Sequence, residues 1–184
     1  MKQFHFTTID STNSEARRLA LKSPSFLDPG IVVTAETQTQ GRGSHGRSWY
    51  SGSKGGLYYS FASRPSNFDL ARCLDYVKGV GELVGSLVEE VTGLKAYLEF
   101  PNDVMLAGKK VGGILIESGV GSASSLPKYV VVGIGLNINQ IRFPKNLVPI
   151  ATSLRLQGKK KYDKSAFSNR LTEKLRSWNF KLSG

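Results

Sequence analysis

The stretch GRGSHGRSWYSGSKGGLYYSF, residues 41–61, decides the fold class through what surrounds its glycines. Its G-x-G-x-x-G spacing is that of a dinucleotide-binding loop, which needs a strand before it and a helix directly after it. The preceding residues GIVVTAETQT (30–39) predict the strand. SWYSGSKGG cannot begin a helix, and LYYSFAS (57–63) alternates as another strand. The pattern therefore excludes NAD and FAD and indicates a glycine-rich connection between two strands.

Apolar periodicity predicts the remaining elements of the chain. Further strands are expected at 4–10, 96–100, 104–118 and 129–139, and helices at 13–23, 68–93 and 165–182. Two of the strands form a hairpin around AGKK. Because strand follows strand through short turns, with helices inserted early and late, we predict one α+β domain over residues 1–184. Its sheet is expected to be mixed and largely antiparallel, with helices on one face.

The bulk properties of the chain narrow its class. The 184 residues contain a single cysteine, Cys73, which rules out an internal disulfide and a cysteine-based zinc site. No apolar run approaches the roughly 20 residues of a transmembrane helix, and MKQFHFTTID has no apolar signal core. We therefore expect a soluble, cytoplasmic protein without a membrane partner. The net charge of +11 favours acidic partners.

Four short segments suggest ligand binding. The loop GRGSHGR can bring backbone N–H groups and arginines around an anion as a flexible lid, or it is a mobile connection with incidental arginines. Asp103 in FPNDV decorates a turn, or binds Mg²⁺ or a ligand hydroxyl. Lys110 is a snorkelling edge residue, or it holds a carboxylate or phosphate. Asn137 and Asn139 stand in an apolar strand, where an amide needs a partner.

The same segments resemble the biotin–protein ligases, the catalytic domain of the biotin/lipoate protein ligase superfamily. DSTN, AETQTQGRGSHGR, FPNDVMLAGKKVGGILIES and GIGLNIN occur in that family's order and spacing, and the resemblance covers about residues 4–155. It implies a fold like that of class II aminoacyl-tRNA synthetases and biotin ligases. It also implies a two-step reaction: biotin and ATP, with Mg²⁺, give biotinyl-AMP, and a lysine of a biotin carboxyl carrier domain then takes the biotinyl group.

Matched position by position, the resemblance implies site residues. The catalytic residues are Lys110, Arg42 and Asp103. The biotin-binding residues are Ser11, Thr12, Gln38, Gly41, Arg42, Lys110, Gly112 and Gly113. The nucleotide-binding residues are Arg42, Gly43, Ser44, Arg47, Trp49, Asn102 and Asn137. Asp103 is in addition the candidate ligand for Mg²⁺ and the candidate base for the lysine amine, and Trp49 is expected to anchor the closed loop.

The chain departs from the family at two places. Ser44 and His45 stand where the family's loop is basic, which predicts weaker retention of the adenylate. Glu99-Phe100 replace a common Lys-Trp pair before the proline. The start and end of the chain lead us to expect a minimal ligase, without an N-terminal DNA-binding domain, a C-terminal β-domain or a DNA partner. A homodimer is left open.

Three rival interpretations remain. A lipoate or octanoate ligase would use a similar fold and chemistry, but it needs a long apolar slot where biotin needs polar contacts. A basic nucleic-acid-binding module would require clustered cations interleaved with aromatics, and only Lys159–Lys161 cluster. A protein that binds biotin without catalysis would fit the departures at Ser44 and Glu99.

Overall fold

The structure is a computed structural model, which describes residues 1–52, 54–66, 68–120 and 127–178. Its strands are β1 (Lys2–Ile9), β2 (Ile31–Gln38), β3 (Gly56–Ser63), β4 (Ala96–Glu99), β5 (Asp103–Leu106), β6 (Lys109–Val120) and β7 (Pro127–Asn137). Its helices are α1 (Thr12–Lys22), α2 (Cys73–Thr92), α3 (Leu154–Gly158) and α4 (Lys164–Trp178), with 3₁₀ turns η1 (Pro24–Leu27), η2 (Ser44–Gly46) and η3 (Leu70–Arg72).

The strands of the described residues form one sheet in the order β1-β2-β3-β7-β6-β5-β4. Strands β1 and β2 are parallel and are connected through α1, whereas the other neighbouring pairs are antiparallel. The predicted hairpin joins β5 to β6 through Ala107 and Gly108, whose φ angles of 50° and 74° suit a tight two-residue turn. The expected α+β class, with a mixed and largely antiparallel sheet, is confirmed.

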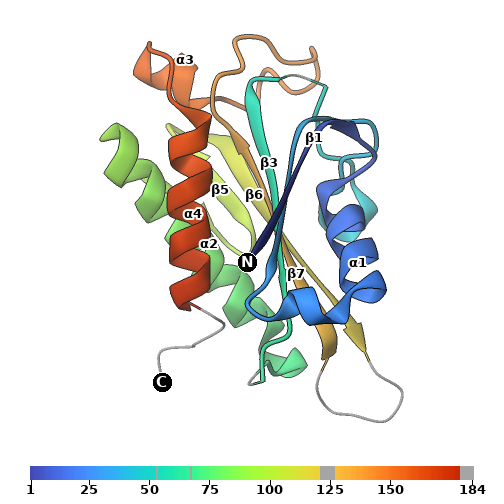
Figure 1. Cartoon of the computed structure of the whole chain (residues 1–184). Coiled ribbons are helices and arrows are strands. Elements are labelled where there is room, and N and C mark those ends of the chain that lie inside the picture. The colour runs from blue at the N-terminus through green and yellow to red at the C-terminus, as the bar shows by residue number, and fades with distance from the viewer. Residues whose placement is uncertain (53, 67, 121–126, 179–184) are drawn as a thin grey trace.

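The helices lie on both faces of the sheet, and here the expectation of a single covered face is wrong (Figure 1). Helices α2 and α4 cover one face, and α1 packs on the other. Neighbouring residues of β7 show why: Val130 and Val132 belong to the core beneath α2 and α4, while Val131 belongs to the core beneath α1. A run such as YVVV is apolar at every position because the strand is buried on both sides.

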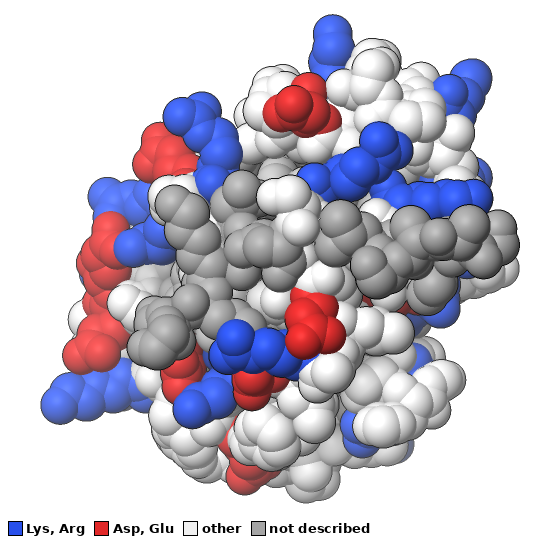
Figure 2. Space-filling view, turned by 90° about the horizontal axis from the view of Figure 1, so that it is seen from below, with Lys and Arg blue, Asp and Glu red and all other residues white. Residues whose placement is uncertain are grey.

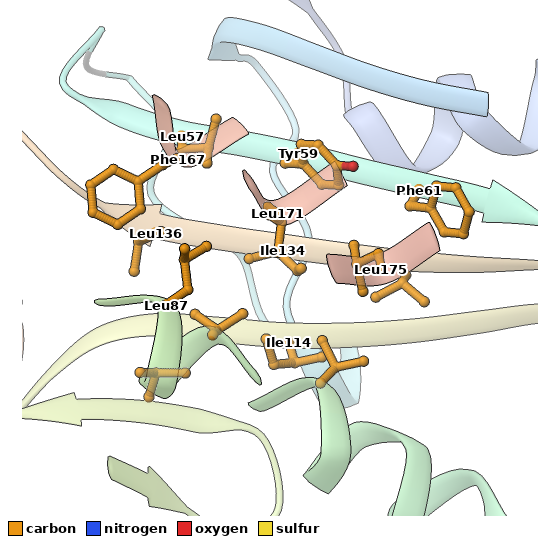
Figure 3. Close-up of a cluster of buried hydrophobic side chains, with 14 of the residues drawn as sticks. Leu57, Tyr59, Phe61, Leu87, Ile114, Ile134, Leu136, Phe167, Leu171 and Leu175 are labelled. Atoms are coloured by element: carbon orange, nitrogen blue, oxygen red, sulfur yellow. The ribbon is translucent and has the colours of Figure 1, made fainter. Parts of the chain in front are cut away.

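The larger core lies between the sheet and helices α2 and α4 (Figure 3). Phe167, Leu171 and Leu175 of α4 are at most 1% exposed and pack over β3 and β7, as the helical spacing predicts. Each such side chain contributes on the order of 1.5–3 kcal/mol through burial. Tyr59 of β3 adds a hydrogen bond of 2.8 Å between its hydroxyl and that of Thr172. The last residues of the helix predicted at 165–182, from 179 onward, lie outside the described residues.

Helix α2 begins later than the sequence predicts. It starts at Cys73 instead of residue 68, because the Asp69 carboxylate accepts a hydrogen bond from Ala71 N and supports the separate turn η3. The helix ends at Gly93, whose φ of 73° is the left-handed cap expected of the glycine. In the described ranges, none of the helices has the length and apolar character of a bilayer span.

Candidate active site

A cavity of about 240 Å³ opens on the α1 face of the sheet, at the end where β2 and β7 finish and β6 begins. Gly133 and Gly135 of β7 and Gly113 of β6 line it. Because side chains alternate along a strand, Val132 and Leu136 of β7 point into the opposite core, and the glycines leave the α1 face hollow. One face of the strand VVGIGLN therefore packs in the core, and its other face lines the cavity.

Trp49 lies on this glycine floor. A β-carbon at Gly135 would lie 2.5 Å from Trp49 Cε2, and one at Gly113 would lie 2.9 Å from Cζ3. Lys110 Nζ stands 5.4 Å from the centre of the indole ring, within reach of a cation–π contact. The buried Nε1 of Trp49 donates no hydrogen bond within the described part of the chain. The indole ring therefore occupies the space that Gly113 and Gly135 leave open.

One end of the cavity is polar. The Ser11 hydroxyl caps α1 by accepting a hydrogen bond of 3.4 Å from Ser14 N, and it still has its own proton to donate. Gln38 Oε1 accepts hydrogen bonds from the Thr12 backbone N at 2.7 Å and from the Thr12 hydroxyl at 3.1 Å, while Gln38 Nε2 donates to Ser51 Oγ at 2.8 Å. These contacts fix hydroxyl and amide groups that a polar ring system could bind.

A second polar chain was missed by the sequence interpretation. Arg42 Nη2 lies 2.8 Å from Glu117 Oε1, and Asn13 Nδ2 donates to Glu117 Oε2 at 2.8 Å. Asn13 Oδ1 accepts a bond of 2.6 Å from Ser60 Oγ, and a β-carbon at Gly133 would lie 2.2 Å from that oxygen. A carboxylate within the apolar run GGILIES was the available signal for Glu117; its partners are distant in sequence.

The other end of the cavity is cationic. Lys110 lines it, and its Nζ lies 2.6 Å from Asp103 Oδ1, with both side chains about one quarter exposed. The turn between β5 and β6 brings the two residues to adjacent strands. Asp103 itself does not line the cavity, so its contact with the site runs through Lys110.

The glycine–arginine loop is folded over the cavity. Gly43 N donates to Arg47 O at 2.7 Å, and Trp49 N donates to Gly41 O at 2.9 Å. Asn102 Nδ2 donates to Ser44 Oγ at 3.2 Å and so ties the loop to the turn between β4 and β5. The loop therefore presents Arg42 and glycine backbone to the cavity, as an anion-binding loop would.

The structure brings most of the predicted site residues to this one cavity. Those that line it are Ser11, Thr12, Gln38, Arg42, Gly43, Ser44, Arg47, Trp49, Asn102, Lys110, Gly113 and Asn137. Those that do not are Gly41, Asp103 and Gly112. A β-carbon at Gly41 would lie 2.4 Å from Trp49 O, so this glycine permits the loop to close on itself.

A segment after β7 also lines the cavity and was not predicted to do so. It contributes Phe143, Leu147, Ile150 and Ala151. Asn137 holds this segment: its Nδ2 donates to Thr152 O at 3.0 Å, and its Oδ1 accepts from Gln140 Nε2 at 3.0 Å. The hydrogen-bond partners that the Asn137 amide requires in this apolar strand are therefore other residues of the same chain. Nothing in the segment's sequence shows which strand end it covers.

The described residues give little support to a protein-bound metal. They contain no group of three or more His, Cys, Asp or Glu side chains that could hold an ion. The one carboxylate that the sequence suggested, Asp103, is paired with Lys110. In this arrangement the Asp103 carboxylate neutralises Lys110 and is not grouped with other metal-ligating side chains of the described residues.

The fold and the cavity define an α+β domain with a partly polar, partly cationic cavity at the end of a mixed sheet, and comparison with known proteins gives the family. The model of the biotin/lipoate A/B protein ligase family matches residues 6–137. The chain belongs to this family.

Individual relatives are consistent with this membership. The chain is 33% identical over 159 residues to the bifunctional ligase/repressor BirA of Bacillus subtilis (strain 168), which covers 85% of this chain and 47% of that protein. It is 34% identical over 174 residues to the biotin–[acetyl-CoA-carboxylase] ligase of Mycobacterium tuberculosis, covering 90% and 59%. The chain thus spans about half the length of the curated relatives it matches.

A solved structure extends the similarity to three dimensions. The biotin protein ligase from Aquifex aeolicus in complex with biotin and ATP superposes with a TM-score of 0.79 at 32% identity. The match covers 98% of this chain and 72% of that one. The similarity includes the segment after residue 137, which the family model does not reach.

Proposed function

We propose that this chain attaches biotin to a lysine of a biotin carboxyl carrier domain, with ATP, through biotinyl-5′-AMP. The observation that carries the proposal is the cavity itself, which joins a polar end at Ser11, Thr12 and Gln38 to a cationic end at Lys110 and Arg42. A ligand with a polar ring at one end and a carboxylate at the other matches this polarity. The solved relative that was complexed with biotin and ATP supports both substrates.

In the first step, a biotin carboxylate oxygen forms a bond to the α-phosphorus of ATP, and the bond to pyrophosphate breaks. The carboxylate and the phosphates repel each other, so the protein must neutralise charge and align the two groups. Lys110 and Arg42 supply the cations. Trp49 and the loop exclude water from the reactive anhydride.

In the second step, the lysine amine bonds to the biotinyl carbonyl carbon, and AMP leaves with the electrons of the anhydride bond. The amine proton must pass to a base, and Asp103 was the candidate. Its place outside the cavity and its contact of 2.6 Å with Lys110 favour a different role. We assign Asp103 to holding Lys110 in position, and Mg²⁺ to the ATP phosphates as part of the substrate.

The decisive experiment incubates the protein with biotin, MgATP and a carrier domain, followed by mass spectrometry of the carrier. We expect a mass gain of one biotinyl group, lost when the acceptor lysine is replaced by arginine. An unmodified carrier, with pyrophosphate release above background, would mean that the adenylate forms but that the carrier domain is not the acceptor. An unmodified carrier without pyrophosphate release would favour a protein that binds biotin without catalysis.

Lipoate and octanoate are the competing substrates, because the family includes lipoate ligases. The hydrogen-bonded groups of Thr12 and Gln38 favour a polar ring over an alkyl chain. Calorimetry with biotin, lipoate and octanoate, each with a non-hydrolysable ATP analogue, separates the three. Binding of lipoate without binding of biotin would overturn the assignment.

A further inference from the structure

Much of the positive charge of the chain lies in the segment that follows β7, part of which lines the cavity. Residues 138–161 contain no Asp or Glu, and their cations are Arg142, Lys145, Arg155, Lys159, Lys160 and Lys161. These six carry more than half of the net charge of +11. The end of the molecule viewed in Figure 2, opposite to this segment in Figure 1, shows acidic and basic side chains interspersed. At that end, unlike in the segment, charges of both signs are present.

The same segment exposes large apolar side chains. Ile141, Val148, Ile150 and Leu156 are 55%, 52%, 59% and 44% exposed. We call these four residues, together with the cations of the segment, the 141–161 surface. Apolar side chains with a charged surround are typical of protein–protein interfaces. A nucleic-acid backbone would be matched by the cations and would leave the apolar side chains without a role.

The backbone beneath this surface is held firmly. Lys110 N donates to Ile150 O at 2.8 Å, and Thr152 N donates to Lys110 O at 2.9 Å, so the segment is bonded to β6. Lys109 Nζ donates to Val148 O at 2.9 Å. The apolar side chains therefore point outward from a fixed backbone, which lowers the entropy cost of binding a partner.

The surface reaches the site through Ile150, which is exposed and also lines the cavity. We propose that the 141–161 surface docks the acceptor, an acidic folded domain, so that its lysine amine enters the cavity beside Ile150. Opposite charge selects and steers the partner, and the apolar side chains form the contact. This inference rests on the proposed function.

The test compares two variants of the full chain with equal charge change. Lys145→Glu with Lys161→Glu alters the surface, and Lys22→Glu with Lys128→Glu alters exposed lysines at the far ends of α1 and β7. Two reactions are followed: biotinylation of a carrier domain, and trapping of the adenylate by hydroxylamine, a small amine that needs no docking.

We expect the surface variant to lower kcat/KM for the carrier by about tenfold, mainly through KM, and to weaken the dependence of transfer on salt. Hydroxylamine trapping should stay within about twofold, and the far-end variant should keep both reactions within about twofold. Val148→Ser should also raise KM for the carrier.

Three outcomes would overturn the inference. One is equal carrier kinetics in the two charge variants. Another is a matching loss of hydroxylamine trapping, which would assign the lysines to the nucleotide instead. The third is duplex DNA binding that only the surface variant loses while carrier transfer is kept. Absence of trapping in the wild-type protein is a different result, because it contradicts the proposed function itself.

Discussion

Arg42 Nη2 lies 2.8 Å from Glu117 Oε1, and this contact joins the glycine–arginine loop to β6 on the floor of the sheet. The Arg42 side chain is about half exposed, so the ion pair contributes at most about 1 kcal/mol to stability. The ion pair matters more for the position of Arg42, because Asn13 donates to the second oxygen of Glu117 and fixes the carboxylate. The pair sets where the cation of the loop stands.

Glu117→Gln tests this positioning role. Glutamine keeps an acceptor for Asn13 but loses the charge that holds Arg42, so kcat/KM for adenylate formation should fall by about tenfold. Thermal unfolding should change little. Glu89→Gln, an exposed carboxylate on α2, is the matched control. Wild-type kinetics in the Glu117 variant would make the ion pair incidental.

Lys110→Ala should slow adenylate formation by about 10²- to 10³-fold, because it removes a fixed cation from the developing charge. Biotin-dependent pyrophosphate exchange measures the effect, and circular dichroism checks the fold. Lys95→Ala, which removes an exposed lysine between α2 and β4, is the control. An unimpaired Lys110 variant would remove this lysine from the mechanism.

Gly135→Ala should weaken biotin binding by about tenfold or more, because the added carbon would lie 2.5 Å from Trp49 Cε2 and the ring must move. Gly85→Ala in α2 is the contrast: its nearest neighbour, Ala96 O, would be 3.5 Å away. That change should raise stability by about 0.5–1 kcal/mol. Calorimetry measures the effect on biotin binding, and thermal unfolding measures the effect on stability. Equal binding by both variants would contradict the glycine-floor interpretation.

Ser44→Arg addresses the departure from the family's basic loop. Ser44 Oγ accepts bonds from Asn102 Nδ2 at 3.2 Å and Arg47 Nη2 at 3.0 Å, at the edge of the cavity. An added guanidinium should hold the adenylate more tightly and reduce its release into solution by about tenfold. Filtration of a reaction without acceptor, followed by assay of the free adenylate, measures this. Ser44→Thr should release it like the wild type.

Asp10→Asn should flatten the loss of stability in acid. Hydrogen bonds from Arg18, at 2.7 and 2.8 Å, lower the pKa of Asp10 from 3.8 to about 2. The folded state therefore gains stability above pH 3.8 and loses it as the pH falls toward 2. Because both side chains are at least one third exposed, the contact is expected to contribute about 0.5–1 kcal/mol to the free energy of unfolding.

Urea unfolding at pH 7 and pH 3 measures the effect, with Glu89→Gln as the control. The wild type and the control should lose more stability between the two pH values than the Asp10 variant does. Parallel losses in all three proteins would show that the contact with Arg18 has no effect on the titration of Asp10.

Most of the strands could be predicted from the sequence because each has its own local pattern of apolar residues. The helix at 68–93 was placed too early, since the Asp69 cap and η3 are a local alternative to helix that periodicity does not distinguish. The site residues on strands and on the loop were identified through the family resemblance. Glu117 and the segment contributing Phe143 and Leu147 were not, because their contacts join residues far apart in the chain.

By itself, the sequence determined that the glycine loop connects two strands, that the sheet is mixed and largely antiparallel, and which family the chain resembles. These follow from periods of two and 3.6 residues and from motif spacing, all of which are local. The tertiary structure decided that both sheet faces are covered, that Arg42 meets Glu117, and that Lys110 meets Asp103 beside Trp49. Strand pairing determines which of these side chains come into contact, and the pairing depends on the whole sheet.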